Sequence, residues 1–226
     1  MERVAAGELP ETLRLARPGR SVAFGKRDVV APGFDSSVRA ARAIGFAPMQ
    51  RLAGGRAAIF HEGTLVFGHA IPDPDPRPGI HDRFQATAEL VVAALARLGV
   101  DARVGEVPGE YCPGRYSVNA RGERKLMGAG QRLISGGAHV GGVVVVEDRE
   151  LVNEALAPVY AALGLAFDPA ATGAVAEEAA AGGASFESVA EALLAEYSER
   201  FDLSRAELDA DTLALAERLA PEHRPR

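Results

Sequence analysis

Three glycine-rich segments carry the polar residues that could do chemistry in this sequence. In the first, residues 51–63, the candidate residues are Arg51, Gly54, Gly55, Arg56 and His61. Glycines let backbone N–H groups approach a ligand closely, and flanking arginines add hydrogen-bond donors and positive charge. The pattern predicts a site for a carboxylate or phosphate, but an ordinary glycine turn with surface arginines has the same composition.

The second segment, residues 122–132, places Lys125 between apolar strand residues and a stretch that contains Gly128. Only two of the 25 basic residues are lysines, Lys26 and Lys125, and the rest are arginines. A partly buried ammonium at position 125 could bind an acyl carbonyl or a phosphate oxygen and stabilise negative charge there. A lysine that protects a hairpin edge from aggregation is the alternative.

His139 and Cys112 complete the set of candidate residues. His139 lies in the third segment, residues 135–142, where it could orient a substrate or serve as a hydrogen-bonded core residue. Cys112 is the single cysteine, in a Cys-Pro-Gly turn that could expose its thiol, and the nearby Arg115 would favour the thiolate. A buried, inert cysteine is the alternative interpretation.

Composition excludes several classes of protein. The net charge is −6 with acidic and basic residues interspersed, so we expect no nucleic-acid partner. We find no run of 18 apolar residues and no signal-peptide layout, and a lone cysteine suits a reducing compartment, so we expect a cytoplasmic protein without a membrane partner. No spacing suits a structural or tightly bound metal, and no P-loop is present.

The elements that must position these residues are strands followed by helices. Periodicity predicts strands at 12–17, 21–24, 49–52, 58–60 and 64–71, a helix at 84–98, a β-meander at 116–146 and a helix at 153–163. Further helices are predicted at 186–201 and after a Ser204–Glu207 capping box, with Leu208, Leu215 and Leu219 turned inward. The fold class is α+β: mixed, largely antiparallel sheets packed with helices, with a main domain at 1–165 and a helical C-terminal extension, 166–226, packed on it.

In this order, the segments resemble the catalytic module of lipoate–protein ligases and octanoyltransferases, in the biotin/lipoate protein ligase superfamily. Those enzymes carry an RRxSGGGxVxH-like glycine loop, a K-[IV]-x-G-x-[AG]-x-R segment and then a His-Gly strand. Residues 51–61, residues 125–132 and His139 align with these motifs. The resemblance covers roughly residues 10–165 and implies that 1–165 is a catalytic domain of this kind.

The resemblance implies a ligase that joins lipoate or octanoate to ATP, with Mg²⁺, as an acyl-adenylate. Lys125 would contact the acyl carbonyl, and residues 51–61 would line the pocket. The acyl group would pass to a lysine of a lipoyl-domain or glycine-cleavage H-type carrier protein. Departures include Leu52 for the second arginine, and Arg56 and Ala57, which would narrow the pocket. No ligase accessory domain is recognisable, so a separate accessory subunit could be required.

Two other hypotheses remain open. In octanoyltransferases that take octanoate from acyl carrier protein, a cysteine thioester replaces ATP and no cofactor is needed. Cys112 lies 13 residues before Lys125, near the position of that cysteine but not in register with it. A non-catalytic acyl-adenylate binding module is the third hypothesis. Biotin ligation is disfavoured because the GRGRxGR-type loop of biotin ligases is absent.

Overall fold

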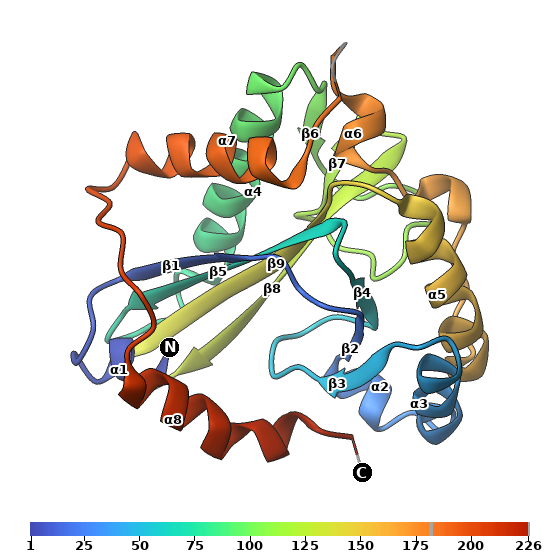
Figure 1. The fold of residues 1–226 in the computed structure, drawn as a ribbon, viewed down its shortest axis with the longest axis horizontal. Coiled ribbons are helices and arrows are strands. Elements are labelled where there is room, and N and C mark those ends of the chain that lie inside the picture. The colour runs from blue at the N-terminus through green and yellow to red at the C-terminus, as the bar shows by residue number, and fades with distance from the viewer. Residues whose placement is uncertain (181–182, 226) are drawn as a thin grey trace.

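A six-stranded antiparallel sheet forms the centre of the protein, which a computed structural model describes for residues 1–180 and 183–225 (Figure 1). Its strand order is β1-β5-β9-β8-β7-β6. The strands are β1 (Thr12–Ala16), β5 (Thr64–Pro72), β6 (Ala102–Val104), β7 (Val118–Ala120), β8 (Arg124–Ile134) and β9 (Gly137–Val145). Alternating apolar residues on these strands bury one face against helices.

Two helices cover one face of this sheet, α4 (Ile80–Arg97) and α7 (Phe186–Ser198). Leu95 of α4 and Leu193 of α7 are almost fully buried in the same core as Leu126 of β8 and Val144 of β9. The short α6 (Val175–Glu178) adds Val175 to this core. Residues beyond 165 therefore help to build the main hydrophobic core.

A second sheet of three strands is mixed, with the order β3-β2-β4. Strand β2 (Ser21–Phe24) is parallel to β3 (Ala47–Gln50) and antiparallel to β4 (Ala58–Phe60). Helices α3 (Phe34–Ala43) and α5 (Arg149–Leu163) pack on it, and the four-residue helix α2 (Lys26–Val29) follows β2. The loop between β3 and β4 carries the glycine-rich residues 51–57, so this sheet positions them.

The predicted α+β class with largely antiparallel sheets is confirmed, and most predicted elements are present with small shifts at their ends. The last predicted helix is wrong at its start and at Leu208, whereas Leu215 and Leu219 are half-buried. Helix α8 (Ala210–Leu219) begins after Asp209, not Ser204, because the Asp209 carboxylate accepts a hydrogen bond from the Thr212 N–H at 2.8 Å. None of its residues is buried, and Leu208 before it is 48% exposed.

Residues 199–225 form a C-terminal arm that runs from α7 past α1 (Glu2–Ala5) to β3 and ends with the 3₁₀ turn η2 (Ala220–His223) (Figure 1). Arg3 donates to Asp209 at 2.6 Å and to Thr212 at 2.7 Å, and His223 Nδ1 lies 2.8 Å from the Gln50 carbonyl oxygen. The predicted extension also includes residues 181, 182 and 226, which lie outside the described residues. We keep the division at residue 165 as a proposal.

Across residues 1–180 and 183–225, no helix combines the length and the apolar character needed to cross a bilayer.

Candidate active site

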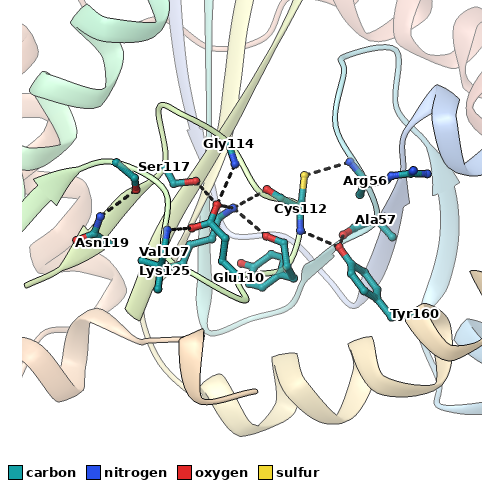
Figure 2. Close-up of polar contacts among 12 residues, drawn as sticks. Arg56, Ala57, Val107, Glu110, Cys112, Gly114, Ser117, Asn119, Lys125 and Tyr160 are labelled. Atoms are coloured by element: carbon teal, nitrogen blue, oxygen red, sulfur yellow. Dashed lines mark hydrogen bonds and ion pairs between the residues drawn. The ribbon is translucent and has the colours of Figure 1, made fainter. Parts of the chain in front are cut away.

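The thiol of Cys112 lies against the glycine bend formed by Gly54, Gly55 and Arg56. Figure 2 shows its contact with the backbone of Arg56. Its sulfur accepts a hydrogen bond from the backbone N–H of Arg56 at 3.1 Å and from Arg51 Nη2 at 3.6 Å. Gly55 has a φ of +102°, and a Cβ at this position would lie 2.9 Å from the sulfur. The sulfur thus lies where a side chain at position 55 would otherwise be.

Lys125 holds the loop that carries Cys112. Its side chain, on β8, is 1% exposed. The ammonium donates to the carbonyl oxygens of Cys112 at 2.8 Å and Tyr111 at 3.0 Å, and to Glu110 Oε1 at 3.1 Å. Gly128 leaves room for it, because a Cβ there would lie 3.2 Å from Lys125 Cε. The lysine and the glycine bend therefore contact the same residue, Cys112, from two sides.

Glu110 is the centre of the same loop and is fully buried. Besides Lys125, its Oε1 accepts from the Gly114 N–H at 3.0 Å and from the Ser117 hydroxyl at 2.6 Å, and its Oε2 accepts from the Val107 N–H at 3.0 Å (Figure 2). A buried carboxylate is stable only when it is paired and hydrogen-bonded in this way. Glu110 therefore fixes the path of the backbone around Cys112.

Tyr160 of α5 joins the cysteine loop to the glycine bend. Its hydroxyl accepts from the Cys112 N–H at 2.9 Å and donates to the Ala57 carbonyl oxygen at 3.1 Å. Burial raises the pKa of Tyr160 far above its ordinary value, so the hydroxyl keeps its proton and remains a donor. Cys112 itself has a φ of +42°, a conformation that is rare and strained for a residue with a side chain. Four residues, Arg51, Arg56, Lys125 and Tyr160, therefore form hydrogen bonds with a strained cysteine.

This arrangement presents a thiol to hydrogen-bond donors in a way that suits nucleophilic chemistry. The Arg56 amide and the Arg51 guanidinium both donate to the sulfur, and the thiolate is the form of cysteine that attacks carbonyl carbons. Arg51 Nη2 also donates to the Arg56 carbonyl oxygen at 2.6 Å, which fixes the guanidinium beside the bend. Acyl transfer is the reaction class that this geometry can support.

The two candidate histidines make their contacts elsewhere. His61 is 2% exposed, its Nδ1 accepts from the Gly63 N–H at 3.1 Å, and burial lowers its pKa. His139 on β9 pairs with Arg132 on β8, seven residues beyond Lys125, which corresponds to roughly 20 Å along the strand. Burial lowers the pKa of His139 to about 4. The structure thus groups Arg51, Gly54, Gly55, Arg56, Cys112, Lys125 and Gly128, but neither histidine.

The Arg56 side chain does not fill the bend, contrary to the expectation that it narrows the pocket. Its guanidinium turns toward α2, where it reaches Asp28 Oδ1 at 3.2 Å and the Arg27 carbonyl oxygen at 3.2 Å. A Cβ added at Gly54 would meet no atom within 4 Å, so that part of the bend is open. The backbone of Arg56, not its side chain, faces Cys112.

Sequence reasoning missed three residues of this site: Glu110, Tyr160 and Asp28. Glu110 stands two residues before Cys112, and a carboxylate beside a Pro-Gly turn is the one signal that could have drawn attention to it. Tyr160 belongs to an otherwise apolar helix face, and Asp28 lies in a charged run with Lys26 and Arg27, so nothing in their neighbourhood separates them from ordinary residues.

The carboxylates near Cys112 are a poor fit for Mg²⁺, which usually needs one or two free carboxylates when it accompanies a nucleotide. Both oxygens of Glu110 and both of Asp28 already accept hydrogen bonds. Within residues 1–180 and 183–225, no three or more His, Cys, Asp or Glu side chains form a group that could hold a metal ion. Any Mg²⁺ bound here would require these hydrogen bonds to rearrange.

Among curated proteins, this chain is similar to octanoyl-[GcvH]:protein N-octanoyltransferases. It is 30% identical to that of Geobacillus kaustophilus over 137 residues, which is 61% of this chain and 48% of the relative. It is 33% identical to that of Exiguobacterium sibiricum over 122 residues, 53% of this chain and 43% of the relative. The chain therefore spans about half the length of the curated relatives that it matches.

Solved structures share the fold. A lipoate–protein ligase A bound with ATP superposes with a TM-score of 0.76 at 22% identity, over 98% of this chain and 87% of the other. A bipartite lipoate–protein ligase from Thermoplasma acidophilum gives a TM-score of 0.73 at 21% identity, over 98% and 85%. The profile of the lipoyl protein ligase A/B catalytic domain matches residues 1–197. With the fold and most of the chain in agreement, this protein belongs to the lipoyl protein ligase A/B catalytic domain family.

Proposed function

We propose that this protein transfers an octanoyl group, or a closely related acyl group such as lipoyl, to a lysine of a carrier protein through a thioester on Cys112. The observation that carries the proposal is the sulfur itself, which accepts the Arg56 N–H at 3.1 Å in a strained loop that Lys125 supports. The names of the curated relatives, which are octanoyltransferases, agree with this choice.

Two acyl transfers make up the reaction. The Cys112 thiol gives up its proton and its sulfur attacks the acyl carbonyl carbon of the donor; the bond to the donor's sulfur or nitrogen breaks, and the donor leaves as a thiol or amine that has taken up that proton. The neutral amine of the acceptor lysine then attacks the thioester, the carbon–sulfur bond breaks, and the proton lost by the amine returns to the Cys112 sulfur as the amide forms. Thiol ester and amide bonds are exchanged, so no nucleotide and no redox partner is needed.

The residues around the sulfur would stabilise the charge that forms on the acyl oxygen. Arg51 has a buried Nε with no hydrogen-bond partner among the described residues, and the Arg56 amide already points at the sulfur. Donors held in place beside a reacting carbonyl lower the barrier to its attack. Lys125 would act on this reaction through the Cys112 carbonyl, by positioning the nucleophile.

The donor and acceptor belong to the same proposal. An octanoylated glycine-cleavage H-type carrier is the donor that the relatives' names suggest, octanoyl acyl carrier protein is the other candidate, and an apo lipoyl domain is the acceptor. A second subunit or a further segment could complete the protein, because the relatives are about twice as long as the matched region. We place the reaction in the cytoplasm, where the single thiol stays reduced.

The ATP-dependent ligase is the second candidate, because the family includes lipoate–protein ligases and the chain keeps the aligned lysine. In that case Lys125 would leave the Cys112 carbonyl to bind an acyl-adenylate, with ATP and Mg²⁺ as cofactors, and the thiol would be dispensable. A non-catalytic acyl-adenylate binding module, which would bind without turnover, is the third.

The test incubates the protein with apo lipoyl domain and one donor at a time: octanoylated H-type carrier, octanoyl acyl carrier protein, or free octanoate with and without ATP and Mg²⁺. Intact-mass measurement should detect octanoyl lipoyl domain with a protein-bound donor and no ATP. The enzyme should gain one octanoyl mass that hydroxylamine removes and that Cys112→Ser lacks. Modification only with free octanoate and ATP, at an equal rate by Cys112→Ser, would overturn the proposal in favour of a ligase.

A further inference from the structure

One carboxylate outside the cysteine loop bonds to residues of the glycine bend and its neighbour Gly25. Asp28, in α2, is fully buried. Its Oδ2 accepts from the Gly25 N–H at 2.9 Å, and its Oδ1 accepts from Arg56 Nη1 at 3.2 Å. A buried carboxylate with two such partners fixes both of them, because either would leave an unsatisfied charge if it moved away.

Of the two residues that bond to Asp28, Gly25 packs against the bend and Arg56 is part of it. A Cβ at Gly25 would lie 2.1 Å from the Gly55 carbonyl oxygen, so the backbone of Gly25 packs against that of Gly55. Arg56 supplies the backbone N–H that the Cys112 sulfur accepts. The Asp28 carboxylate therefore fixes Gly25, which packs against the bend. Through the guanidinium it also fixes Arg56, whose amide contacts the thiol.

The Arg56 side chain has a second anchor on the same helix. Its Nη1 also donates to the Arg27 carbonyl oxygen at 3.2 Å, and the side chain is 25% exposed. The guanidinium is thus anchored to α2 while the backbone amide of the same residue donates to the Cys112 sulfur, and Asp28 supplies the charge that holds the guanidinium in place.

We infer that Asp28 is a positioning residue for Cys112: the Asp28–Arg56 ion pair keeps the Arg56 amide in place as a hydrogen-bond donor to the sulfur. This inference rests on the proposed function, in which Cys112 is the nucleophile, but it makes a statement about the thiol that holds whatever the substrate is. Loss of the pair lets the bend relax, so the sulfur loses the Arg56 N–H as a hydrogen-bond donor and reacts more slowly with electrophiles.

The test measures the rate at which iodoacetamide alkylates Cys112, as a function of pH, in the whole protein. Asp28→Asn should lower the rate at pH 7 about tenfold and move the midpoint of the pH profile upward, because a hydrogen bond to a charged group is worth roughly that factor or more. Arg56→Gln, which keeps the amide but removes the charge, should have a similar effect. The double variant should be no slower than either single variant, since both break one pair.

Controls separate this role from a general loss of stability. Asp35→Asn, at an exposed carboxylate of α3, removes the same charge and should leave the alkylation profile unchanged. Each variant is first checked by thermal denaturation, and rates are compared only well below its melting temperature. In the transfer assay, Asp28→Asn should lower kcat with little change in KM for the carrier.

An unchanged pH midpoint in folded Asp28→Asn overturns the inference, whatever the transfer assay shows. Additive effects of the two substitutions overturn it as well, because Asp28 and Arg56 would then act separately. Failure of the proposed function has a different signature: Cys112→Ser would keep its activity, while the dependence of thiol reactivity on Asp28 would persist.

Discussion

Lys125 contacts Cys112 through the backbone: its ammonium lies 2.8 Å from the Cys112 carbonyl oxygen, while the thiol is held by the amide of Arg56. The lysine and the cysteine thus belong to one constellation in which the charge supports the peptide and the sulfur stays free to react. In the ligase hypothesis the same ammonium would bind the activated acid instead.

Replacing Lys125 by methionine should destabilise the protein strongly, because Glu110 would be left as a buried charge without its partner. Breaking a buried ion pair from one side typically costs about 3–5 kcal/mol of unfolding free energy. Urea denaturation measures the loss of unfolding free energy, and the rate of acyl transfer should also fall in this variant. Lys26→Met, at the other, exposed lysine, is the matched control and should lie within about 0.5 kcal/mol of the parent.

The pairing itself is tested by a second substitution. Glu110→Gln in the Lys125→Met background removes the unpaired charge, so the double variant should recover part of the lost stability. If the double variant is less stable than Lys125→Met by the full cost of Glu110→Gln alone, the two side chains act independently and this account of the loop is wrong.

Tyr160→Phe should weaken both the loop and the bend, since it removes the acceptor of the Cys112 N–H and the donor to the Ala57 carbonyl. Leaving buried backbone groups unpaired costs about 1–3 kcal/mol. Tyr197→Phe provides the control, because among the described residues the buried Tyr197 hydroxyl has no hydrogen-bond partner. Thermal denaturation should show a clear loss for the first variant and almost none for the second.

Gly55→Ala should impair folding and activity, because position 55 requires a φ of +102° and a Cβ there would lie 2.4 Å from Arg51 Nη2. Strain of this kind costs about 1–3 kcal/mol. Gly54→Ala is the comparison for stability, since its Cβ would meet no atom within 4 Å. Equal stability of the two variants, measured by denaturant titration, would show that the bend is not constrained as described.

His139 should make the protein sensitive to mild acid. Burial lowers its pKa to about 4, whereas the unfolded chain binds the proton near pH 6.5. The stability that comes from a neutral His139 is therefore complete above about pH 6.5 and is lost as the pH falls from 6.5 toward 4. The full loss is ~3 kcal/mol.

Denaturation at several pH values tests this dependence. His139→Gln should flatten the fall in stability between pH 6.5 and 4, while His81→Gln, at an exposed histidine, should leave its slope nearly unchanged. Burial also lowers the pKa of His61 and of His69, so some acid sensitivity should remain in the His139 variant. An identical slope in His139→Gln and the parent would contradict the assignment.

Periodicity predicted most of this fold because the strands and helices bury regular apolar faces. Val144 and Leu193, for example, lie in the core on a strand and a helix that the periodicity predicted. The start of the C-terminal helix was predicted wrongly because the Ser204–Glu207 pattern resembles a capping box, whereas the helix is capped by Asp209, which accepts the Thr212 N–H. Arg3, 206 positions away, also bonds to Asp209, and a contact of this range leaves no pattern in the local sequence.

The candidate site was predictable only where local sequence marks its residues. Lys125, Gly55 and Cys112 stood out by residue type and local sequence. Glu110, Tyr160 and Asp28 did not, because their importance comes from partners brought together only by folding: Tyr160, for example, bonds to a residue 48 positions away. His139 resembles a site residue in sequence, but strand register carries it to the far end of β8.

The backbone of residue 112 is held through its N–H by Tyr160 and through its carbonyl oxygen by Lys125, and every amino acid except proline has both groups. These backbone contacts therefore do not depend on the reactive group that residue 112 carries. Serine at position 112, or asparagine, which tolerates a φ of +42° better, would fit the same surrounding backbone. Lineages built on this scaffold could gain or lose a nucleophile at position 112 without inventing a new loop.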